Sequence, residues 1–210
     1  MDATSVTVHS ITDVGPNTVA IDLETPDGFH AEPGQFVLVR ADVNGEELAR
    51  HYTISSPRVG DTFEITVGVD PDGDLSPWLA DLEEGDELSV AGPFGSVSYA
   101  GDGPVLTLAG GPGIGPALAI AERAVEDGHD AAVVYFDDAP AHEDRLDDLE
   151  AGGTPVRIVD SEDGLSAAVQ DLAGTGQPFV FGFREFCDLA VDALEAAGED
   201  AGDVEVESFG

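Results

Sequence analysis

Two short stretches of the sequence combine residue types that could bind a phosphate-bearing ligand. "AGGPGIGP", Ala109 to Pro116, follows one predicted strand and opens a predicted helix. Glycines at such a turn let the backbone approach an anion, and the first helical turn adds amide donors and the positive end of the helix dipole. "RHYTISS", Arg50 to Ser56, places a guanidinium on another predicted strand, and this planar, permanently charged group suits a diphosphate. The alternatives are a tight turn without a ligand and an ordinary surface arginine.

The helices and strands that would carry these residues fall into two halves, which differ in the spacing of their apolar residues. Before about Gly101 the chain consists of short alternating segments separated by turns that contain Gly and Pro, which is typical of strands. Ser76 to Gly85 is the one helical segment expected there, with a Ser cap, Pro77 at its first position and a glycine at its end. Six strands with one small helix predict an antiparallel β-barrel. The strand segments are SVTVHSITDVG, TVAIDLETPDG, QFVLVR, RHYTISS, TFEITVGVD and ELSVAGPFG.

From about Gly101 onward, apolar strand-like segments alternate with helical ones. PVLTLAG, AAVVYF, PVRIVD and PFVFGF are the predicted buried strands, and a helical segment follows each of them. Strict β–α alternation predicts a parallel sheet covered by helices on both faces. The boundary between the halves is expected in "SYAGDG", Ser98 to Gly103, so the chain would divide into domains at residues 1–99 and 100–210.

The charge composition is extreme. Among 210 residues there are seven cationic side chains, all arginine, against 44 Asp and Glu, which gives a formal net charge of −37. The acidic residues are distributed along the whole chain, and at molar salt the Debye length falls to about 3 Å, so most of the resulting repulsion disappears. The absence of lysine favours a protein from the cytoplasm of a halophile; an acidic protein from an ordinary cell is the alternative. Nucleic acid and anionic membranes are not expected as partners, because both bind basic surfaces.

Three further features bear on location and metal content. With a lone cysteine, Cys187, we expect no intramolecular disulfide and no cysteine-ligated iron–sulfur cluster within this chain, and we predict no metal site. The N-terminal MDATSVTVHS has neither a positive region nor an apolar core, so no signal peptide is expected. The least charged long run, PVLTLAGGPGIGPALAIA, is interrupted by Gly and Pro and does not predict a membrane span.

Taken in order, these motifs resemble the ferredoxin–NADP reductase family. A predicted barrel carrying RHYTISS is followed by GDLSPWLADLEEGDELSVAGPFG and then by AGGPGIGP at the start of an α/β half; PGQFVLVR resembles the family's third strand, and VEVESFG resembles its closing Glu-x-Phe. The resemblance covers nearly the whole chain. It implies an FAD-binding barrel at residues 1–99, an α/β half at 100–210 that binds NADH or NADPH, and no fused iron–sulfur domain.

The resemblance also implies roles for individual residues. Arg50 would pair with the pyrophosphate of FAD, Tyr52 would pack on the isoalloxazine or touch the ribityl chain, and Thr53 would hydrogen-bond near the reactive edge of the ring. Phe209 would lie against the flavin, the alternative being an ordinary core residue. Tyr52, Thr53 and Phe209 are thus the expected catalytic residues. The expected cofactor-binding residues are Arg50, His51, Tyr52, Thr53, Gly73, Asp74, Leu75, Ser76, Gly110, Gly111, Gly113, Ile114, Gly115, Pro116 and Phe209.

Two details of these assignments depend on local geometry. The stretch GDLS, Gly73 to Ser76, precedes the small helix, where backbone amides and the Ser76 hydroxyl can face an anion. An alternative, compatible with the first, is that Ser76 caps its own helix. In the other stretch, strand alternation puts Arg50 and Tyr52 on one face and His51 and Thr53 on the opposite face. A ligand that contacts all four would have to meet a twisted or bulged strand.

The sequence departs from the family pattern in the α/β half. Phe181-Gly182-Phe183 stands where the family usually has Cys-Gly-Pro, whose cysteine lies against the nicotinamide. Cys187, inside a predicted helix, is interpreted as a buried small residue, and Pro112 removes one backbone N–H from the glycine loop. These changes affect the expected binding of a pyridine nucleotide more than that of FAD.

Acidic residues in the α/β half favour NADH over NADPH. Asp137, Asp138, Asp160 and Glu162 follow the second and third predicted strands of this half. There they would repel a 2′-phosphate, whereas an acidic side chain can accept a hydrogen bond from a free ribose hydroxyl. Surface acid without a role in binding is the alternative.

The resemblance implies a flavoprotein oxidoreductase that passes a hydride from NAD(P)H to FAD and electrons to a separate acceptor, either a ferredoxin-like protein or a small molecule. The alternatives are an electron-transfer subunit of a larger assembly and a flavin-binding redox sensor without productive nicotinamide binding. Phe181-Gly182-Phe183 and Pro112 are the features that favour the sensor.

Overall fold

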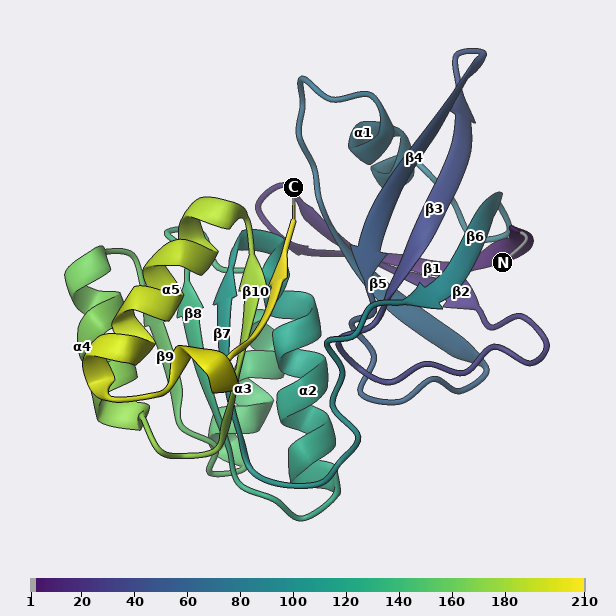
Figure 1. Cartoon of the computed structure of the whole chain (residues 1–210). Helices are drawn as coiled ribbons and strands as arrows, with labels where there is room; N and C mark the ends of the chain where they lie inside the picture. Colours follow the sequence, from purple (N-terminus) through teal and green to yellow (C-terminus); the bar gives the residue numbers. More distant parts are fainter. Residues whose placement is uncertain (1–2, 210) are drawn as a thin grey trace.

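Two sheets of different type follow one another along the chain in the computed structural model, which describes residues 3–209 (Figure 1). The first sheet is antiparallel and has the strand order β4-β3-β6-β1-β2-β5. Its strands are β1 (Thr4–Gly15), β2 (Thr18–Glu24), β3 (Phe36–Val43), β4 (Glu46–Thr53), β5 (Thr62–Gly68) and β6 (Glu87–Phe94), with the small helix α1 (Leu75–Ala80) between β5 and β6.

The antiparallel sheet curls into a barrel because its two edge strands meet. Beyond the end of β4, Ile54 forms an antiparallel bridge with Ile65 of β5, and the Ser55 N–H donates to the Glu64 carbonyl at 2.8 Å. Inward-facing apolar side chains of the strands fill the interior and form one continuous core. Such closure protects strand edges from solvent and from other chains. The predicted six-stranded antiparallel fold is confirmed.

The small helix is shorter than the sequence predicts. α1 ends at Ala80, whereas the composition favoured a helix as far as Gly85. The segment after Ala80 forms a turn instead: the Asp86 carboxylate accepts from the Glu83 N–H at 2.8 Å, and Gly85 has a φ of +93°. An acidic side chain that bonds to the backbone and a glycine in the left-handed region both favour a turn over a helix.

The second sheet is parallel, has the order β11-β10-β7-β8-β9, and alternates with helices along the chain. α2 and α3 pack on one face and α4 and α5 on the other, with a separate apolar cluster at each interface (Figure 1). The predicted parallel sheet with two covered faces is therefore confirmed. The elements are β7 (Val105–Gly110), a 3₁₀ turn (Gly111–Gly113), α2 (Ile114–Glu126), β8 (Ala131–Phe136), α3 (Glu143–Ala151), β9 (Val156–Val159), α4 (Glu162–Leu172), β10 (Gln177–Gly182), α5 (Arg184–Ala197), a second 3₁₀ turn (Ala201–Asp203) and β11 (Glu205–Ser208).

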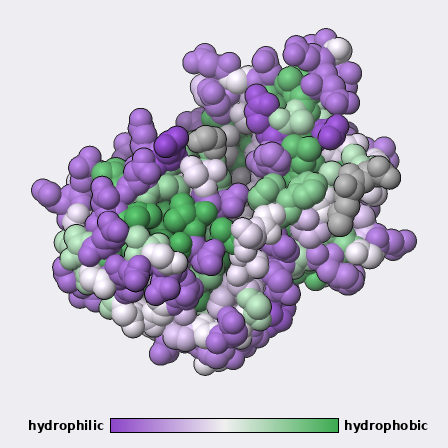
Figure 2. Space-filling model, viewed as in Figure 1, coloured by the Kyte–Doolittle hydropathy of each residue, from purple (hydrophilic) through white to green (hydrophobic). Residues whose placement is uncertain are grey.

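The acidic residues lie at the surface. No Asp or Glu within residues 3–209 is fully buried, and Figure 2 shows hydrophilic residues over most of the visible face. Large apolar side chains are rarely exposed in this part of the chain, and Phe183, at 58% exposure, is the most exposed of them. Among the described helices, none is long and apolar enough to cross a membrane.

Candidate functional site

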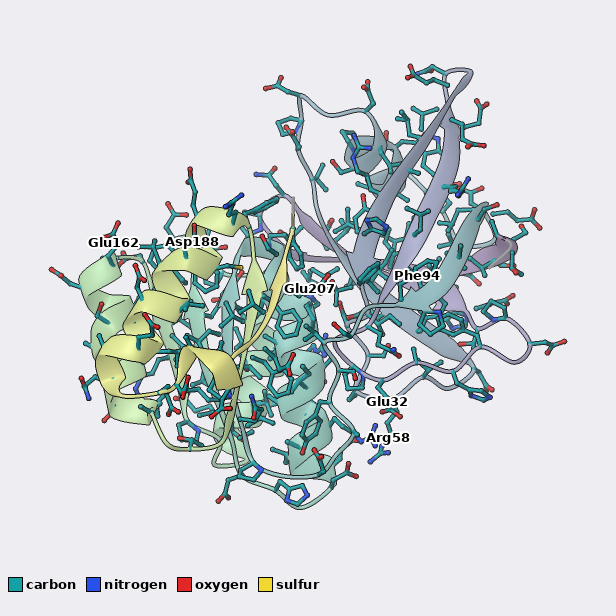
Figure 3. The ribbon with its side chains drawn as sticks, viewed as in Figure 1. Glu32, Arg58, Phe94, Glu162, Asp188 and Glu207 are labelled. Carbon is teal, nitrogen blue, oxygen red and sulfur yellow. The ribbon has the colours of Figure 1, made fainter. Side chains whose placement is uncertain are left out.

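A cavity of about 590 Å³ lies between the barrel and the α/β half. The barrel contributes β4, β5 and the loop that leads into α1. The α/β half contributes the 3₁₀ turn before α2, the start of α2, Phe183 and the C-terminal residues Glu207–Phe209; Figure 3 shows Glu207 between the two halves. Ligand pockets generally measure about 300–1,000 Å³ and often lie at domain interfaces, so this cavity has the size and the location of a ligand site.

Within residues 3–209, Arg50 is the arginine that lacks an acidic partner. Each of the other six arginines forms at least one ion pair with Asp or Glu within 4.0 Å. Arg50 forms none within residues 3–209; its Nη1 donates to the Ala49 carbonyl at 2.8 Å, and its side chain lines the cavity. In a chain with a net charge of −37, a guanidinium without a carboxylate is available to an anionic ligand.

The neighbours of Arg50 on β4 also line the cavity: His51, Tyr52 and Thr53. β4 pairs with β3 in regular register, without a bulge in that pairing. Residues from both faces of β4 nevertheless line the cavity. Thr53 is buried, and burial raises the pKa of the Tyr52 phenol to about 12, although Arg50 opposes the shift.

Asp70 organises the loop that precedes α1. Its carbonyl accepts from the Gly73 N–H at 3.0 Å, and its own N–H donates to the Ser76 hydroxyl at 3.1 Å. Ser76 therefore does not cap its own helix, whose N-cap is Asp74. The hydroxyl proton of Ser76 and the first amides of α1 have no partner within the helix. The residues of this loop that line the cavity are Asp70, Gly73, Asp74, Leu75 and Ser76.

Most glycines of the Ala109–Pro116 loop are packed against protein atoms. A Cβ at Gly110 would clash with an aromatic ring of α5, one at Gly113 with the carbonyl at the end of β10, and one at Gly115 with two hydroxyls in the barrel. Gly111 differs, since a Cβ there would meet nothing within 4 Å and its φ is +55°. Close packing thus accounts for three of the four glycines without any ligand.

The remaining residues of this loop divide between core and cavity. Ile114, the first residue of α2, is fully buried in the core and is not among the residues that line the cavity. Pro116 and Pro112 both line the cavity, and Pro112 also packs near Gly68 of the barrel. The loop therefore joins the two halves and contributes prolines, rather than glycines, to the wall of the cavity.

The Phe-Gly-Phe stretch splits between core and cavity. Phe181 is fully buried in the core, whereas Phe183 lines the cavity and lies edge-on to the Phe209 ring at a centroid distance of 6.1 Å. Phe209 is fixed by its N–H, which donates to the Gly182 carbonyl at 2.9 Å. Cys187 is buried, with Sγ 3.4 Å from the same carbonyl, and burial raises the pKa of its thiol to about 11. The thiol is therefore protonated at neutral pH.

The acidic residues considered for ribose binding lie beyond the carboxyl ends of β8 and β9, apart from the cavity lining. Asp137 is engaged locally: its carboxylate accepts from the Ala139 N–H at 2.9 Å and from the Tyr135 hydroxyl at 3.2 Å. Asp138 is exposed and makes no hydrogen bond of this kind. Asp160 and Glu162 are exposed at the start of α4, and Figure 3 shows Glu162 at the outer end of that helix.

Comparison with known proteins finds similarity to FAD-dependent reductases in both halves of the chain. Residues 5–99 match the family model for the oxidoreductase FAD-binding domain. The 3-ketosteroid-9-alpha-monooxygenase ferredoxin reductase component of Mycolicibacterium smegmatis is 32% identical over 203 residues, which cover 87% of this chain and 57% of that protein. Residues 5–99 thus match an oxidoreductase FAD-binding domain, and most of the chain is similar to a ferredoxin reductase component. The predicted resemblance is confirmed.

Two further ferredoxin reductase-like comparisons extend this result. The glycine betaine monooxygenase reductase subunit of Pseudomonas aeruginosa is 39% identical over 121 residues, which cover 55% of this chain and 33% of that protein. The chain thus spans only a third of the length of this relative and little more than half of the previous one. A ferredoxin NADP⁺ reductase from Neisseria gonorrhoeae, solved with bound FAD and NADP, superposes over the whole of both chains with a TM-score of 0.82 at 18% identity, which shows a common fold.

The ferredoxin reductase-like motifs explain part of the cavity, but sequence reasoning missed several of its residues. Pro112 and Phe183 were noted as departures from the family pattern, and Phe36, Glu207 and Ser208 lie in stretches quoted for the resemblance, but none of them was predicted to line a site. The cavity residues that were not among the predicted site residues are Phe36, Leu48, Thr66, Gly68, Asp70, Pro112, Phe183, Glu207 and Ser208.

A buried polar cluster adjoins the cavity where the two halves meet. Thr66 Oγ1, at the cavity wall, lies 2.9 Å from Ser55 Oγ and 2.9 Å from His142 Nε2. His142 is buried, and its backbone N–H donates to the Val14 carbonyl at 2.7 Å. Burial lowers the pKa of the imidazole to about 3, and Arg145 adds to the shift, so His142 is neutral at neutral pH. Ser55 belongs to the RHYTISS stretch, but Thr66 and His142 lie on separate segments without a motif, so the sequence did not predict that the three side chains meet.

We expect His142 to make the folded protein sensitive to acid. Its folded pKa of about 3 lies below the ordinary value of 6.5, so the unfolded chain takes up the proton first, and stabilisation that is complete above pH 6.5 is lost as the pH falls towards 3. The full shift corresponds to on the order of 5 kcal/mol. In His142→Gln, which cannot titrate, this loss should be absent. Melting temperatures of both proteins across this pH range in molar KCl test the expectation.

The comparison of the two proteins isolates His142 from other titrating groups. Burial raises the pKa of Glu64 to about 7, so its contribution has the opposite sign: stability from this group increases as the pH falls from 7 towards the ordinary value of 4.5. Glu64 is present in both proteins and cancels in the difference. If the melting temperatures of the two proteins changed with pH in parallel, the imidazole would not be desolvated as the geometry indicates.

Proposed function

We propose that this chain is an FAD-dependent NAD(P)H oxidoreductase that passes electrons to a separate acceptor. The observation that carries the proposal is Arg50, which has no acidic partner within residues 3–209 and faces a cavity between an FAD-binding-type barrel and a parallel α/β half. Every other arginine is neutralised by a carboxylate, so the exception supports a ligand that brings its own negative charge.

The residues around the cavity fit FAD. Arg50, together with the Ser76 hydroxyl and the free amides at the start of α1, would hold the pyrophosphate, because all of these are donors to an anion in the same cavity. Tyr52 remains a neutral phenol and would pack on the ring system. Thr53, nearly inaccessible to water, would donate its hydroxyl proton at the edge of the ring. His51 and the Gly73–Leu75 backbone complete the proposed cofactor-binding set.

When bound, FAD supplies the redox chemistry: it takes a hydride, which is one proton and two electrons, from NADH or NADPH and gives the electrons up singly. The residues of this chain bind and orient the reactants, and hydride transfer needs no general base from them. Phe183 and Phe209 form the wall on the side of the α/β half, from which a nicotinamide would approach. Of the loop residues Gly110, Gly111, Gly113, Ile114, Gly115 and Pro116, we propose Gly111 as the closest contact for the nucleotide, because it is the glycine with open space beside it.

The names of the relatives support a separate electron acceptor. One is a reductase subunit of a glycine betaine monooxygenase, and the other is a ferredoxin reductase component of a steroid monooxygenase. We propose the same division of labour here, with a ferredoxin-like protein or a small molecule as the acceptor. The net charge of −37 without a single lysine supports a location in a salt-rich cytoplasm.

A second candidate function is a flavin-binding redox sensor that no nicotinamide reduces. Phe183, exposed at the cavity, supports this candidate, because its ring stands at the end of β10 where the family has a smaller residue. Stopped-flow mixing of the oxidised, FAD-loaded protein with NADH and with NADPH separates the two functions. Flavin bleaching within seconds supports the oxidoreductase, and a stable yellow protein with both nucleotides supports the sensor.

We expect NADH to reduce the flavin faster than NADPH. A 2′-phosphate near the acidic edge beyond β8 and β9 would cost roughly 1–2 kcal/mol at an effective dielectric between that of protein and water, which is a preference of about 5- to 30-fold. Asp138 is the residue to change, since Asp137 also holds its own loop. Asp138→Arg should raise the rate with NADPH and lower the discrimination, and more so as KCl is lowered within the range where the protein stays folded.

Asp192→Arg is the matched control for this prediction, because it makes the same charge change at an exposed position within α5. If both variants shifted the NADH-to-NADPH rate ratio equally, the acidic residues beyond β8 would act only as general surface charge. A wild-type preference for NADPH would show that the ribose site lies elsewhere.

A further inference from the structure

Three of the seven arginines form ion pairs across the boundary between the two halves. They belong to two clusters, each of which includes residues of α2. The inner cluster is built around Arg145 of α3. The outer cluster lies at the far end of α2 and consists of Arg58, Glu32, Arg123, Glu126 and Asp127; Figure 3 shows Glu32 and Arg58 side by side next to that end of α2. In a chain so poor in cations, this concentration of arginines at one boundary points to a role there.

The inner cluster is the more enclosed of the two. Arg145 holds Glu122 of α2 with two parallel bonds, from Nε at 2.8 Å and from Nη2 at 2.7 Å. The same guanidinium reaches the barrel through Nη1 to the Glu64 carboxylate and Nη2 to the Ser55 carbonyl, each at 2.9 Å. The three charged side chains are only 20–22% exposed, whereas Arg58 in the outer cluster is 50% exposed. The guanidinium therefore makes two hydrogen bonds to each half, both to Glu122 in the α/β half and one each to Glu64 and Ser55 in the barrel.

The inner cluster fixes the elements that wall the cavity. Ser55 comes two residues after Thr53, and Glu64 lies on β5 two residues before Thr66, which lines the cavity. On the other side, Glu122 belongs to α2, whose first turn lines the cavity through Pro116. Gly115 packs directly on the Ser55 and Thr66 hydroxyls, where no Cβ would fit. One guanidinium thus sets the separation between β4 and β5, which carry the flavin-binding residues, and α2, which begins at the glycine loop.

We propose that Arg145 is a positioning residue for hydride transfer: it holds the α/β half at the distance and angle from the barrel that brings a bound nicotinamide against the flavin. This inference rests on the proposed function. A fixed near-attack geometry contributes strongly to rate, and a displacement of about 1 Å can cost about 100-fold. We expect that removing the guanidinium preserves FAD binding to the barrel and changes the alignment of the two halves.

The test compares Arg145→Met with Arg157→Met in the full chain loaded with FAD in molar KCl. Methionine keeps the apolar stem and removes the donors. Arg157 is the matched control, since its ion pair with Asp171 lies within the α/β half, away from the cavity. In Arg145→Met we expect FAD content to be unchanged and the limiting rate of flavin reduction by NADH to fall roughly 10- to 100-fold. The NADH concentration for half-maximal rate should change little, because the nucleotide-binding segments themselves are untouched.

A second variant protects the test against misfolding. Arg145→Met leaves the Glu64 and Glu122 carboxylates without their cation, which can destabilise the fold. Glu64→Gln keeps the Arg145–Glu122 pair and an acceptor for Nη1 but removes the cross-boundary charge, and it should slow reduction in the same direction by a smaller factor. Reduction in either folded variant at the rate of Arg157→Met would overturn the inference.

Two readouts distinguish this inference from the proposed function. Adding NAD⁺ to the chemically reduced protein should give long-wavelength charge-transfer absorbance in the wild type, since that band requires the nicotinamide to stack on the flavin, and the band should weaken in Arg145→Met. Small-angle scattering should show a larger radius of gyration for Arg145→Met than for Arg157→Met. If neither nucleotide reduces the wild type or gives the band, the proposed function fails, and an unchanged scattering profile would then also refute the positioning role of Arg145.

Discussion

Replacing Arg50 with alanine should weaken FAD binding by roughly 30- to 1,000-fold, or about 2–4 kcal/mol. In the wild-type protein the guanidinium lines the cavity, and no carboxylate in the described part of the chain neutralises it, so the diphosphate of FAD would be its strongest partner. Its removal leaves the phosphates in a chain of strongly negative charge, held only by the amides and the hydroxyl at the start of α1. Titration of the apoprotein with FAD in molar KCl, followed by flavin fluorescence, measures the change.

Arg40→Ala is the control for this experiment. Arg40 lies on the neighbouring strand β3, is also partly exposed, and pairs with Glu47 at 3.6 Å. The control loses the same charge from the same sheet without touching the cavity lining, so its FAD affinity should be close to that of the wild type. Equal affinities in Arg50→Ala and Arg40→Ala would mean that the pyrophosphate binds elsewhere.

The ligand released on denaturation should be FAD rather than FMN, since the proposed site has donors for two phosphates.

The second large effect concerns salt. With 44 acidic residues and seven arginines, the folded surface repels itself, and screening shortens the range of that repulsion from about 10 Å at 0.1 M salt to about 3 Å at 1 M. We expect the melting temperature to rise steeply with KCl. A gain of roughly 4 kcal/mol would correspond to an increase of about 8–16 °C for a chain of this size. Differential scanning fluorimetry across a KCl series is sufficient to measure it.

The salt effect can be assigned to charge rather than to a general effect of solute. α3 carries exposed acidic residues near its C-terminal end, where the helix dipole makes negative charge unfavourable. Changing Asp147, Asp148 and Glu150 of α3 to their amides should therefore raise the melting temperature at low salt and reduce its slope against KCl. NaCl at equal ionic strength should act as KCl does. A melting temperature independent of KCl in the wild type would remove the argument for a salt-rich cytoplasm.

The sequence was sufficient to predict the architecture, because apolar residues follow a regular pattern in each half. Alternation marked the barrel strands, and the β–α rhythm marked the parallel sheet, since these patterns reflect burial directly. The error at α1 has a local cause: the segment to Gly85 has helical composition, but the Asp86 carboxylate holds the Glu83 amide in a turn. Such side-chain bonds compete with helix formation and are difficult to rank from sequence.

For the site, residue type was informative for a rare charged residue such as Arg50. It was uninformative for the glycines, because the same residue type also serves close packing. A guanidinium in an acidic chain pointed to Arg50 before its missing partner was visible. The glycines were ambiguous, because a glycine that admits a ligand and one that admits a neighbouring carbonyl look identical in sequence; Gly111 and Gly113 differ only in what surrounds them in the fold. The Arg145 cluster had no sequence signal at all, since its members are distant in the chain and meet only when the two halves pack.

The inner cluster also determines how freely the two halves could be exchanged with those of related proteins. The linker around Ser98 to Gly103 is the obvious crossover point for a chimaera, because the barrel ends before it and the parallel sheet begins after it. A crossover there would separate Glu64 and Ser55 from Arg145. The two halves can therefore be separated in sequence, but their ion pairs cross the boundary. A donor half would carry a largely buried carboxylate or guanidinium, and it is compatible only with a recipient that has the complementary group at the same place.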